Sequence, residues 1–293
     1  MASIVLFCKS YRDDVLRAKQ LIRSVEKFNT EGLPLYVSVP SADVPLFKEK
    51  CAGLRFHLLA DEEIIAANPL LDSQSFAELP GGLAQQVVKS EFWRLGHASN
   101  YVCLDSDCCF LRPFAKSDFI APDGTPYTVM NESKELLHFA EVAGLPKIEQ
   151  DRARECEEIM GLFGRSGRFW DFGPIPVVWS ALVWRDLEEK YLRPRGKNFI
   201  DAIRQHPSEL RWYGEALLAY RGIPLIPVEP LFRCYHYEEQ YYFWRRAGET
   251  DEQLAKHYLG AVMQSNWDKR LDLVKRFRFS KLRKRVRRLF RGY

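Results

Sequence analysis

Two aspartates separated by one residue carry the clearest chemical signal in the sequence. Asp105 and Asp107 directly follow an apolar run at residues 101–104, which is typical of a short buried strand. Open parallel sheets bind ligands beyond the carboxyl ends of their strands, so this pair is expected at a binding edge. Two carboxylates this close repel each other unless a cation neutralises them, and their hard oxygens suit Mg²⁺ or Mn²⁺, which can bridge the phosphates of a nucleotide diphosphate. The alternative is an Asp pair that only caps a turn.

The elements around this pair predict a parallel α/β sheet, because strands and helices alternate over the first 120 residues. Strands are expected at residues 4–7, 35–39, 55–59 and 101–104. Helices are expected at residues 15–28, 41–50, 61–67 and 84–95, the first behind a possible Asp13 cap and the last stopping at Gly96.

The pattern is looser after residue 120. Helices are expected at residues 147–162, 181–191, 198–205, 209–220 and 252–265, with a strand at 223–228. Residues 164–176 are rich in Gly, Pro and aromatic residues, which suits a mobile loop beside a site. No linker divides the chain. We therefore expect one domain over residues 1–274, with a nucleotide-binding half at about 1–120, an acceptor half at about 121–274 and a separate tail at 275–293.

The aspartate pair lies within a longer stretch that resembles a group of bacterial glycosyltransferase-like proteins of the GT-A fold. The matching residues read GLAQQVVK at 82–89 and YVCLDSDCCFLRPF at 101–114. More loosely, the resemblance includes the opening strand and helix and the segments 212–215 and 235–237, so that it covers about residues 3–240. It implies a Rossmann-type mixed sheet flanked by helices and the transfer of a sugar from a nucleotide diphosphate donor, with a UDP-sugar favoured.

The resemblance also implies roles for the residues of the pair. Asp107 would bind Mn²⁺ or Mg²⁺ directly, and Asp105 would reach the donor ribose or a metal-bound water. A metal at this position stabilises the negative charge on a departing diphosphate. Gln85 and Lys89 share one helical face and are candidate donor contacts, with a solvated helix lysine as the alternative for Lys89. His236 is a candidate third metal ligand or, alternatively, a structural histidine among aromatic residues.

Two acidic residues are candidates for the catalytic carboxylate. Glu215 is preferred because the resemblance includes it, and Asp171 in the Gly-rich loop is its rival. Either could take a proton from the acceptor hydroxyl or stabilise an oxocarbenium-like centre, so retention and inversion both stay open. Glu215 is alternatively a plain acid on a helix surface.

The residues after the first strand are candidate contacts to the donor base and ribose. They are Lys9, Ser10, Tyr11 and Asp13. Tyr11 has a ring that can stack on a base. Asp13 could accept a hydrogen bond from the base, and the helix-cap role noted above is its simpler explanation.

The charge of the chain is strongly segregated. Ten of the 43 basic residues and no acidic residue lie in 275–293, so the preceding residues hold 33 basic and 39 acidic residues, a net charge of −6. Apolar residues recur in the tail every three or four positions, as in a helix that lies in a membrane surface. They are Phe279, Leu282, Val286, Leu289, Phe290 and Tyr293. A solvated end and nucleic-acid binding are the alternatives, and the acidic body disfavours the latter.

Other features limit the class of protein. No apolar run reaches the roughly 18 residues of a membrane span, and Lys9 follows residues 1–7 too soon for a signal peptide. The seven cysteines lack C-x-x-C spacing, so we expect reduced thiols. We therefore expect a cytoplasmic glycosyltransferase on the inner face of the inner membrane that extends a lipid-linked lipopolysaccharide or capsule precursor. The alternatives are a nucleotide-binding scaffold, a metal-dependent phosphatase and a nucleotidyltransferase.

Overall fold

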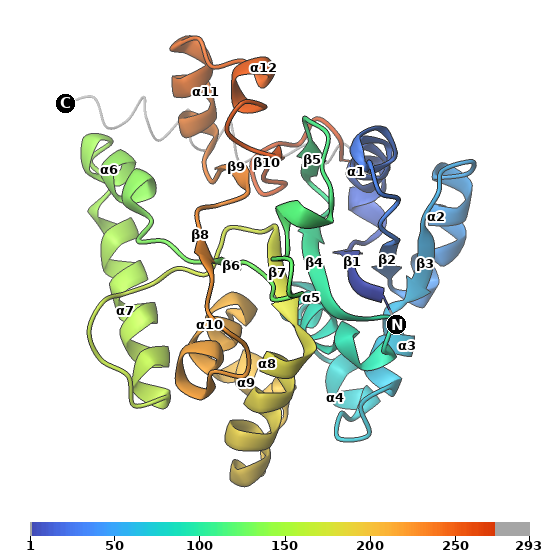
Figure 1. Ribbon diagram of the computed structural model, residues 1–293, viewed down its shortest axis with the longest axis vertical. Coiled ribbons are helices and arrows are strands. Elements are labelled where there is room, and N and C mark those ends of the chain that lie inside the picture. The colour runs from blue at the N-terminus through green and yellow to red at the C-terminus, as the bar shows by residue number, and fades with distance from the viewer. Residues whose placement is uncertain (1, 273–293) are drawn as a thin grey trace, which may run out of the picture.

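A five-stranded sheet forms the centre of the computed structural model, which describes residues 2–272 (Figure 1). Its strand order is β3-β2-β1-β4-β7, with the first four strands parallel and β7 antiparallel to β4. The strands are β1 (Ala2–Lys9), β2 (Leu35–Val39), β3 (His57–Ala60), β4 (Ala98–Asp105) and β7 (Val177–Ser180). The four strands expected from the sequence are confirmed, and the antiparallel β7 makes the sheet mixed.

Helices cover this sheet, and they occur well beyond the first 120 residues of the chain (Figure 1). In the first half the helices are α1 (Val15–Phe28), α2 (Val44–Lys50), α3 (Asp61–Ala66), α4 (Ser73–Ala77) and α5 (Gly81–Glu91). In the second half they are α6 (Lys134–Val142), α7 (Pro146–Leu162), α8 (Ala181–Asp186), α9 (Phe199–Gln205), α10 (Glu209–Tyr220), α11 (Glu238–Arg246) and α12 (Asp251–Leu254). The helix α5 packs on α3, α9 and β1, whereas α1 packs on α2 and on the strand β5 (Cys108–Phe110).

Two smaller sheets stand beside the central one. In the first, β10 (Gly260–Met263) pairs antiparallel with β5 (Cys108–Phe110) and parallel with β9 (Phe232–Tyr235). In the second, β6 (Thr128–Val129) pairs with β8 (Pro227–Val228). Because β5 follows β4 after a two-residue turn, the three-stranded sheet brings the end of the described chain next to the end of β4.

One sequence expectation is wrong in this region. The helix expected at residues 252–265 is replaced by the short α12 and the strand β10. The apolar residues 259–263 have no period that separates helix from strand, and Gly260 disfavours a helix interior. Gly260 also packs against the carbonyl of Cys109 and the ring of Phe232, where a Cβ atom would clash. Pairing with two strands distant in sequence therefore decides the structure.

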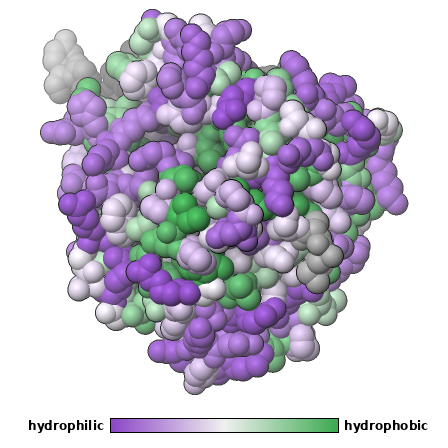
Figure 2. Space-filling view, in the orientation of Figure 1, coloured by the Kyte–Doolittle hydropathy of each residue, from purple (hydrophilic) through white to green (hydrophobic). Residues whose placement is uncertain are grey.

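The core is apolar and lies on both sides of the central sheet's strands. Buried side chains of β1, β4 and α1 belong to one continuous cluster, which includes Phe7, Leu21 and Val102. Figure 2 shows that hydrophilic residues cover most of one face of the molecule, with hydrophobic residues gathered over β6 and β8. The helix expected in the tail, residues 275–293, lies outside the described residues.

Candidate functional site

A cavity of about 640 Å³ opens at the carboxyl edge of the parallel strands, and we call it the edge cavity. The parallel register aligns Lys9 at the end of β1 with Asp105 at the end of β4, which places both at this edge. The cavity is also lined by the start of α5 and by the residues that follow β10. Most of the predicted donor-binding and metal-binding residues line it, namely Lys9, Ser10, Tyr11, Gln85, Asp105 and Asp107.

A buried lysine forms an ion pair with Asp105, which still lines the edge cavity. The Lys89 ammonium lies 2.6 Å from Asp105 Oδ1 and 3.3 Å from Glu209 Oε1, and its side chain is only 3% exposed. Burial opposes its charge, but the carboxylates of Asp105 and Glu209 hold the pKa of Lys89 well above its usual value. Lys89 is therefore a buried structural cation under the aspartate pair. The alternative of a solvated helix lysine is therefore wrong, and the role of Lys89 as a donor contact stays a prediction, although Lys89 does not line the edge cavity.

Asp107 has one carboxylate oxygen that no protein group satisfies. Its Oδ2 accepts a hydrogen bond of 2.8 Å from the backbone N–H of Ser265, whereas its Oδ1 is buried and has no hydrogen-bond partner among the described residues. Burial and, after it, the nearby charge of Asp105 raise the pKa of Asp107 to about 7. A buried carboxylate oxygen without a donor is costly, so it calls for a proton or a cation.

The donor set of the edge cavity fits a hard divalent cation that also binds phosphate. Six carboxylates but only two basic side chains, Lys9 and Arg12, line it: Asp14, Asp43, Asp61, Glu62, Asp105 and Asp107. Within the described residues no group of three or more His, Cys, Asp or Glu side chains is arranged as a complete metal site. Mg²⁺ needs less than that, because it is commonly held by one or two carboxylates together with substrate phosphates. Asp107 and Asp105 meet that requirement.

Of the four expected base-binding and ribose-binding residues, Lys9, Ser10 and Tyr11 line the edge cavity, whereas Asp13 does not. Tyr11 is 45% exposed there, which leaves its ring available for stacking. The Lys9 ammonium is buried and forms an ion pair of 2.9 Å with Asp61, whose other carboxylate oxygen has no hydrogen bond in the described part of the chain. Asp13 lies in a short 3₁₀ helix before α1, and Asp14, not Asp13, occupies the N-cap position. The expected Asp13 cap is therefore wrong.

The residues that follow β10 form a wall that the sequence did not predict. Met263 N–H donates to the Asp107 carbonyl oxygen at 3.2 Å, and Gln264, Ser265 and Asn266 then line the edge cavity. We call residues 264–272 the closing segment. A local signal could not have revealed it, because its position depends on the pairing of β10 with β5. Its amide and hydroxyl oxygens add neutral ligands that suit a metal or a phosphate-bound water.

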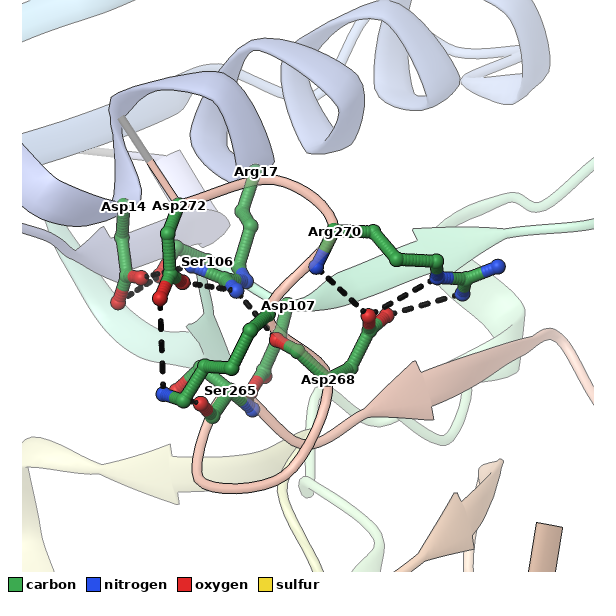
Figure 3. A network of polar contacts seen from close by, with 9 residues as sticks. Asp14, Arg17, Ser106, Asp107, Ser265, Asp268, Arg270 and Asp272 are labelled. Carbon is green, nitrogen blue, oxygen red and sulfur yellow. Dashed lines mark hydrogen bonds and ion pairs between the residues drawn. The ribbon is translucent and has the colours of Figure 1, made fainter. Parts of the chain in front are cut away.

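A buried arginine of α1 holds the closing segment in place (Figure 3). Arg17 donates to Asp14 Oδ1 at 2.6 Å, to the Asp268 carbonyl oxygen at 2.5 Å and to Asp272 Oδ1 at 2.6 Å, and its side chain is 3% exposed. On the cavity side, Ser106 Oγ donates to Asp14 Oδ2 at 3.2 Å. The turn between the two aspartates is thus linked through Asp14 and Arg17 to the end of the described chain.

His236 does not line the edge cavity. It lines a second cavity of about 440 Å³, which we call the side cavity, together with residues of β9, the start of α6 and the loop that carries Trp170. Burial lowers the pKa of His236, which favours the neutral imidazole. Its Nδ1 lies 3.8 Å from Cys234 Sγ. The proposed role of His236 as a metal ligand stays a prediction.

Glu215 and Asp171, the candidate catalytic carboxylates, line neither cavity. Arg165 binds both oxygens of Glu215 at 2.5 Å, and Glu215 is 2% exposed. Glu215 is therefore not on a helix surface. Asp171 accepts hydrogen bonds from Ser133 Oγ and from Arg152 at 2.7 Å, and it forms an ion pair of 3.1 Å with Arg211. Burial opposes ionisation, but Arg211, Ser133 and Arg152 lower the pKa of Asp171. The catalytic roles of both stay predictions.

Comparisons with known proteins agree with this architecture. The sequence model of a group described as "Family of unknown function (DUF6492)" matches residues 2–280. No curated protein sequence matches the chain. Among solved structures, mouse xyloside xylosyltransferase 1 in its apo form is similar over 90% of this chain and 98% of that chain, with a TM-score of 0.50 and 9% sequence identity.

At this identity the likeness concerns the fold alone. The chain has a GT-A-like glycosyltransferase fold, a mixed sheet flanked by helices, as the resemblance in its sequence predicted. Among the described residues no helix is long and apolar enough to cross a lipid bilayer.

Proposed function

Since the chain belongs to the family of unknown function (DUF6492) and has a GT-A-like fold, we propose that it is a metal-dependent glycosyltransferase. It transfers a sugar from a nucleotide diphosphate donor, with a UDP-sugar favoured, to a lipid-linked bacterial glycan such as a lipopolysaccharide core or capsule precursor. The observation that carries the proposal is the pair Asp105 and Asp107 at the floor of the edge cavity, beyond the carboxyl end of β4. This is where open α/β sheets bind their ligands.

The electrostatics of the edge cavity support a donor that arrives with a metal. Four of its six carboxylates are paired with Lys or Arg, and the other two, Glu62 and Asp107, leave a negative excess that disfavours a diphosphate alone. Mn²⁺ or Mg²⁺, held by Asp107 and Asp105, would supply a Lewis acid for the charge that develops on the departing diphosphate. Lys89 forms an ion pair with Asp105 at 2.6 Å. Asp107 also lines the cavity, and its buried Oδ1 has no hydrogen-bond partner among the described residues.

The chain's own residues would bind and orient the rest of the donor. Tyr11 presents an exposed ring for the base, and Ser10 has a buried hydroxyl without a hydrogen-bond partner in the described residues. Gln85 reaches the cavity from the first turns of α5. The closing segment places Gln264 and Asn266 over the same space. Between them these groups surround a volume of about 640 Å³, within the range of small-molecule sites.

The proposal places the protein at the cytoplasmic face of the inner membrane. The basic tail, residues 275–293, would attach it to anionic lipid, since each cation near such a surface contributes on the order of 1 kcal/mol. An acceptor that cannot leave the bilayer is then presented to an enzyme that stays beside it. We keep the division into a nucleotide-binding half, an acceptor half and a tail as part of the proposal.

Ligand binding and donor hydrolysis test the proposal directly. The full chain is heated with each of several nucleoside diphosphates, with and without Mn²⁺, because a ligand that binds only the native state raises Tm. We expect the nucleoside diphosphate with one particular base to raise Tm in the presence of Mn²⁺ and not with EDTA. The matching nucleotide sugar should be slowly hydrolysed without an acceptor, and Asp107→Ala should abolish both effects. The control is Asp123→Ala, at an exposed turn that does not line the edge cavity. A fully active Asp107→Ala enzyme would refute the proposal.

A further inference from the structure

The side cavity is a second binding site with its own chemistry. Its volume of about 440 Å³ is within the range of ligand sites, and it lies between β9, the start of α6 and the loop that carries Trp170. In Figure 1, β9 continues the chain that runs upward from β8, and α6 lies to its left. None of the residues assigned above to the donor or to the metal lines it except His236.

The side cavity and the edge cavity meet at one pair of side chains. Cys234 lines the side cavity and Gln264 lines the edge cavity. Gln264 Nε2 lies 3.7 Å from Cys234 Sγ, and the neighbouring strands pair Cys234 with Val262. A molecule in the side cavity is therefore adjacent to one in the edge cavity.

The charges that line the side cavity are already paired, except for one carboxylate. Arg233 binds Glu135, and Lys134 binds Glu132 at 3.0 Å. Among the described residues, Glu229 forms no ion pair and is exposed at the cavity. An anionic ligand would therefore be repelled by Glu229. Among the described residues, both cations that line the cavity, Arg233 and Lys134, are already in ion pairs. A phosphate or carboxylate group on the ligand is disfavoured on these grounds.

The remaining lining suits a ring with hydroxyl groups. Trp170 is half-buried and offers a flat apolar surface, and Phe232 and Pro174 lie in the same wall. Around them stand side chains that accept or donate hydrogen bonds, among them Glu132 and Glu135. Gln240 is 2% exposed and fixes this wall by accepting from the His236 N–H at 2.9 Å and donating to Glu135 at 3.3 Å. An apolar face with convergent polar groups is the usual composition of a small-molecule site.

We propose that the side cavity binds the acceptor's terminal sugar, and that this sugar is uncharged or carries an amino group, with no phosphate or carboxylate on its ring. This inference rests on the proposed function and names the acceptor class of that reaction. Trp170 stacks on the apolar face of the sugar, the unpaired Glu229 repels anionic rings, and the junction of Cys234 and Gln264 leads the acceptor hydroxyl towards the donor.

The test is direct binding of simple glycosides to the full chain. Methyl glycosides with glucose, galactose or mannose configuration are titrated in the presence of the preferred nucleoside diphosphate and Mn²⁺, each as the neutral, the 2-amino and the uronic acid form. Ligand-observed NMR measures the dissociation constants. We expect a neutral or amino glycoside to bind saturably, and its uronic acid form to bind about tenfold more weakly or not at all. Binding of no neutral or amino glycoside, or equal binding of the uronic acid form, would overturn the proposal.

Two variants locate the binding. Trp170→Ala should weaken the preferred glycoside about tenfold, whereas Trp93→Ala, at another half-buried tryptophan that lines neither cavity, should not. Glu229→Lys should strengthen the uronic acid form about fivefold or more. Equal effects of the two tryptophan variants would contradict the location.

The nucleotide measurement separates the two proposals. If a nucleoside diphosphate binds with Mn²⁺ and no neutral or amino glycoside does, only the inference about the side cavity is wrong. If no nucleoside diphosphate binds, the proposed function is itself wrong.

Discussion

At the scale of single residues, Asp107 has a buried carboxylate oxygen that lowers the stability of the fold and that a cation could satisfy. Its Oδ1 is buried without a donor among the described residues, and its pKa is raised to about 7, first by burial and then by the charge of Asp105. An unfolded aspartate has a pKa of about 3.9. The folded state therefore holds an extra proton between these values. The stability that this proton provides is complete below about pH 4 and is lost as the pH rises through about 7.

The direction of this pKa shift gives a prediction for the metal-free protein. Asp107→Asn cannot ionise, so in EDTA we expect its Tm to exceed that of the parent by about 4 °C or more at pH 8, and the difference to shrink towards pH 5. Differential scanning calorimetry at the two pH values measures this. The control is Asp123→Asn, because hydrogen bonds from Thr125 lower the pKa of Asp123 and both pH values lie above it. A Tm difference for Asp107→Asn that is the same at both pH values would contradict the raised pKa.

Lys89 is a buried cation that forms ion pairs with both Asp105 and Glu209. Removing a buried partner leaves uncompensated charge, so we expect Lys89→Met to destabilise the fold by about 3–5 kcal/mol, with Asp105 and Glu209 left unpaired. Chemical denaturation measures the free energy of unfolding. The matched control is Lys50→Met, which breaks the exposed pair of Lys50 with Glu49 and should cost less than about 1 kcal/mol. Similar losses for the two variants would show that Lys89 is not held as described.

At the scale of elements, the sequence predicted those parts of the site that depend on local pattern. The strands β1, β2 and β4 have apolar runs of strand length, and α1 and α5 have helical spacing, so the residue pattern alone places Asp105 and Asp107 at a strand end. The wall formed by Gln264, Ser265 and Asn266 could not be predicted in this way. Its strand, β10, exists because β5 and β9 pair with it, and the sequence around it favours neither helix nor strand.

The contrast between local pattern and contacts that are distant in sequence also explains the prediction for Lys89. Helical spacing correctly placed Lys89 on the face of α5 that it shares with Gln85. The ion partner Glu209 is 120 residues away in sequence. No local pattern indicates such a contact, so a buried lysine and a solvated lysine could not be distinguished.

The closing segment gives a prediction at this scale, because Arg17 holds it without lining the edge cavity. Arg17→Lys keeps the charge but cannot bind Asp14, Asp268 and Asp272 together, since an ammonium lacks the guanidinium fork. We expect faster amide hydrogen exchange over residues 264–272 and about tenfold weaker binding of the nucleoside diphosphate with Mn²⁺. Mass-detected exchange and titration calorimetry measure these effects.

The control for this prediction lies on the same helix. Arg23→Lys changes an exposed arginine of α1 and should alter neither quantity. Unchanged nucleotide binding in Arg17→Lys, despite faster exchange in the closing segment, would show that this segment does not contribute to the site.

At the scale of the whole molecule, the separation of charge is the property that the fold does not explain. Residues 1–274 have a net charge of −6, and the tail has ten cations without an acid. An acidic body is repelled by anionic lipid, so attachment must come from the tail and must weaken with salt. We therefore expect the full chain to sediment with liposomes that contain anionic lipid and to be released at high ionic strength. Liposomes of zwitterionic lipid alone should retain less.

Deletion of residues 275–293 separates attachment from chemistry. The shortened chain should lose its binding to anionic liposomes and keep its hydrolysis of a soluble nucleotide sugar, because every residue of the edge cavity precedes the deletion. A variant with six of the ten cations changed to glutamine keeps the tail's length and apolar residues, and it should bind anionic liposomes much more weakly than the parent. If this variant binds as well as the parent, charge does not drive attachment. If the deletion itself leaves liposome binding unchanged, the tail is not the anchor, and the acidic body must contain another one.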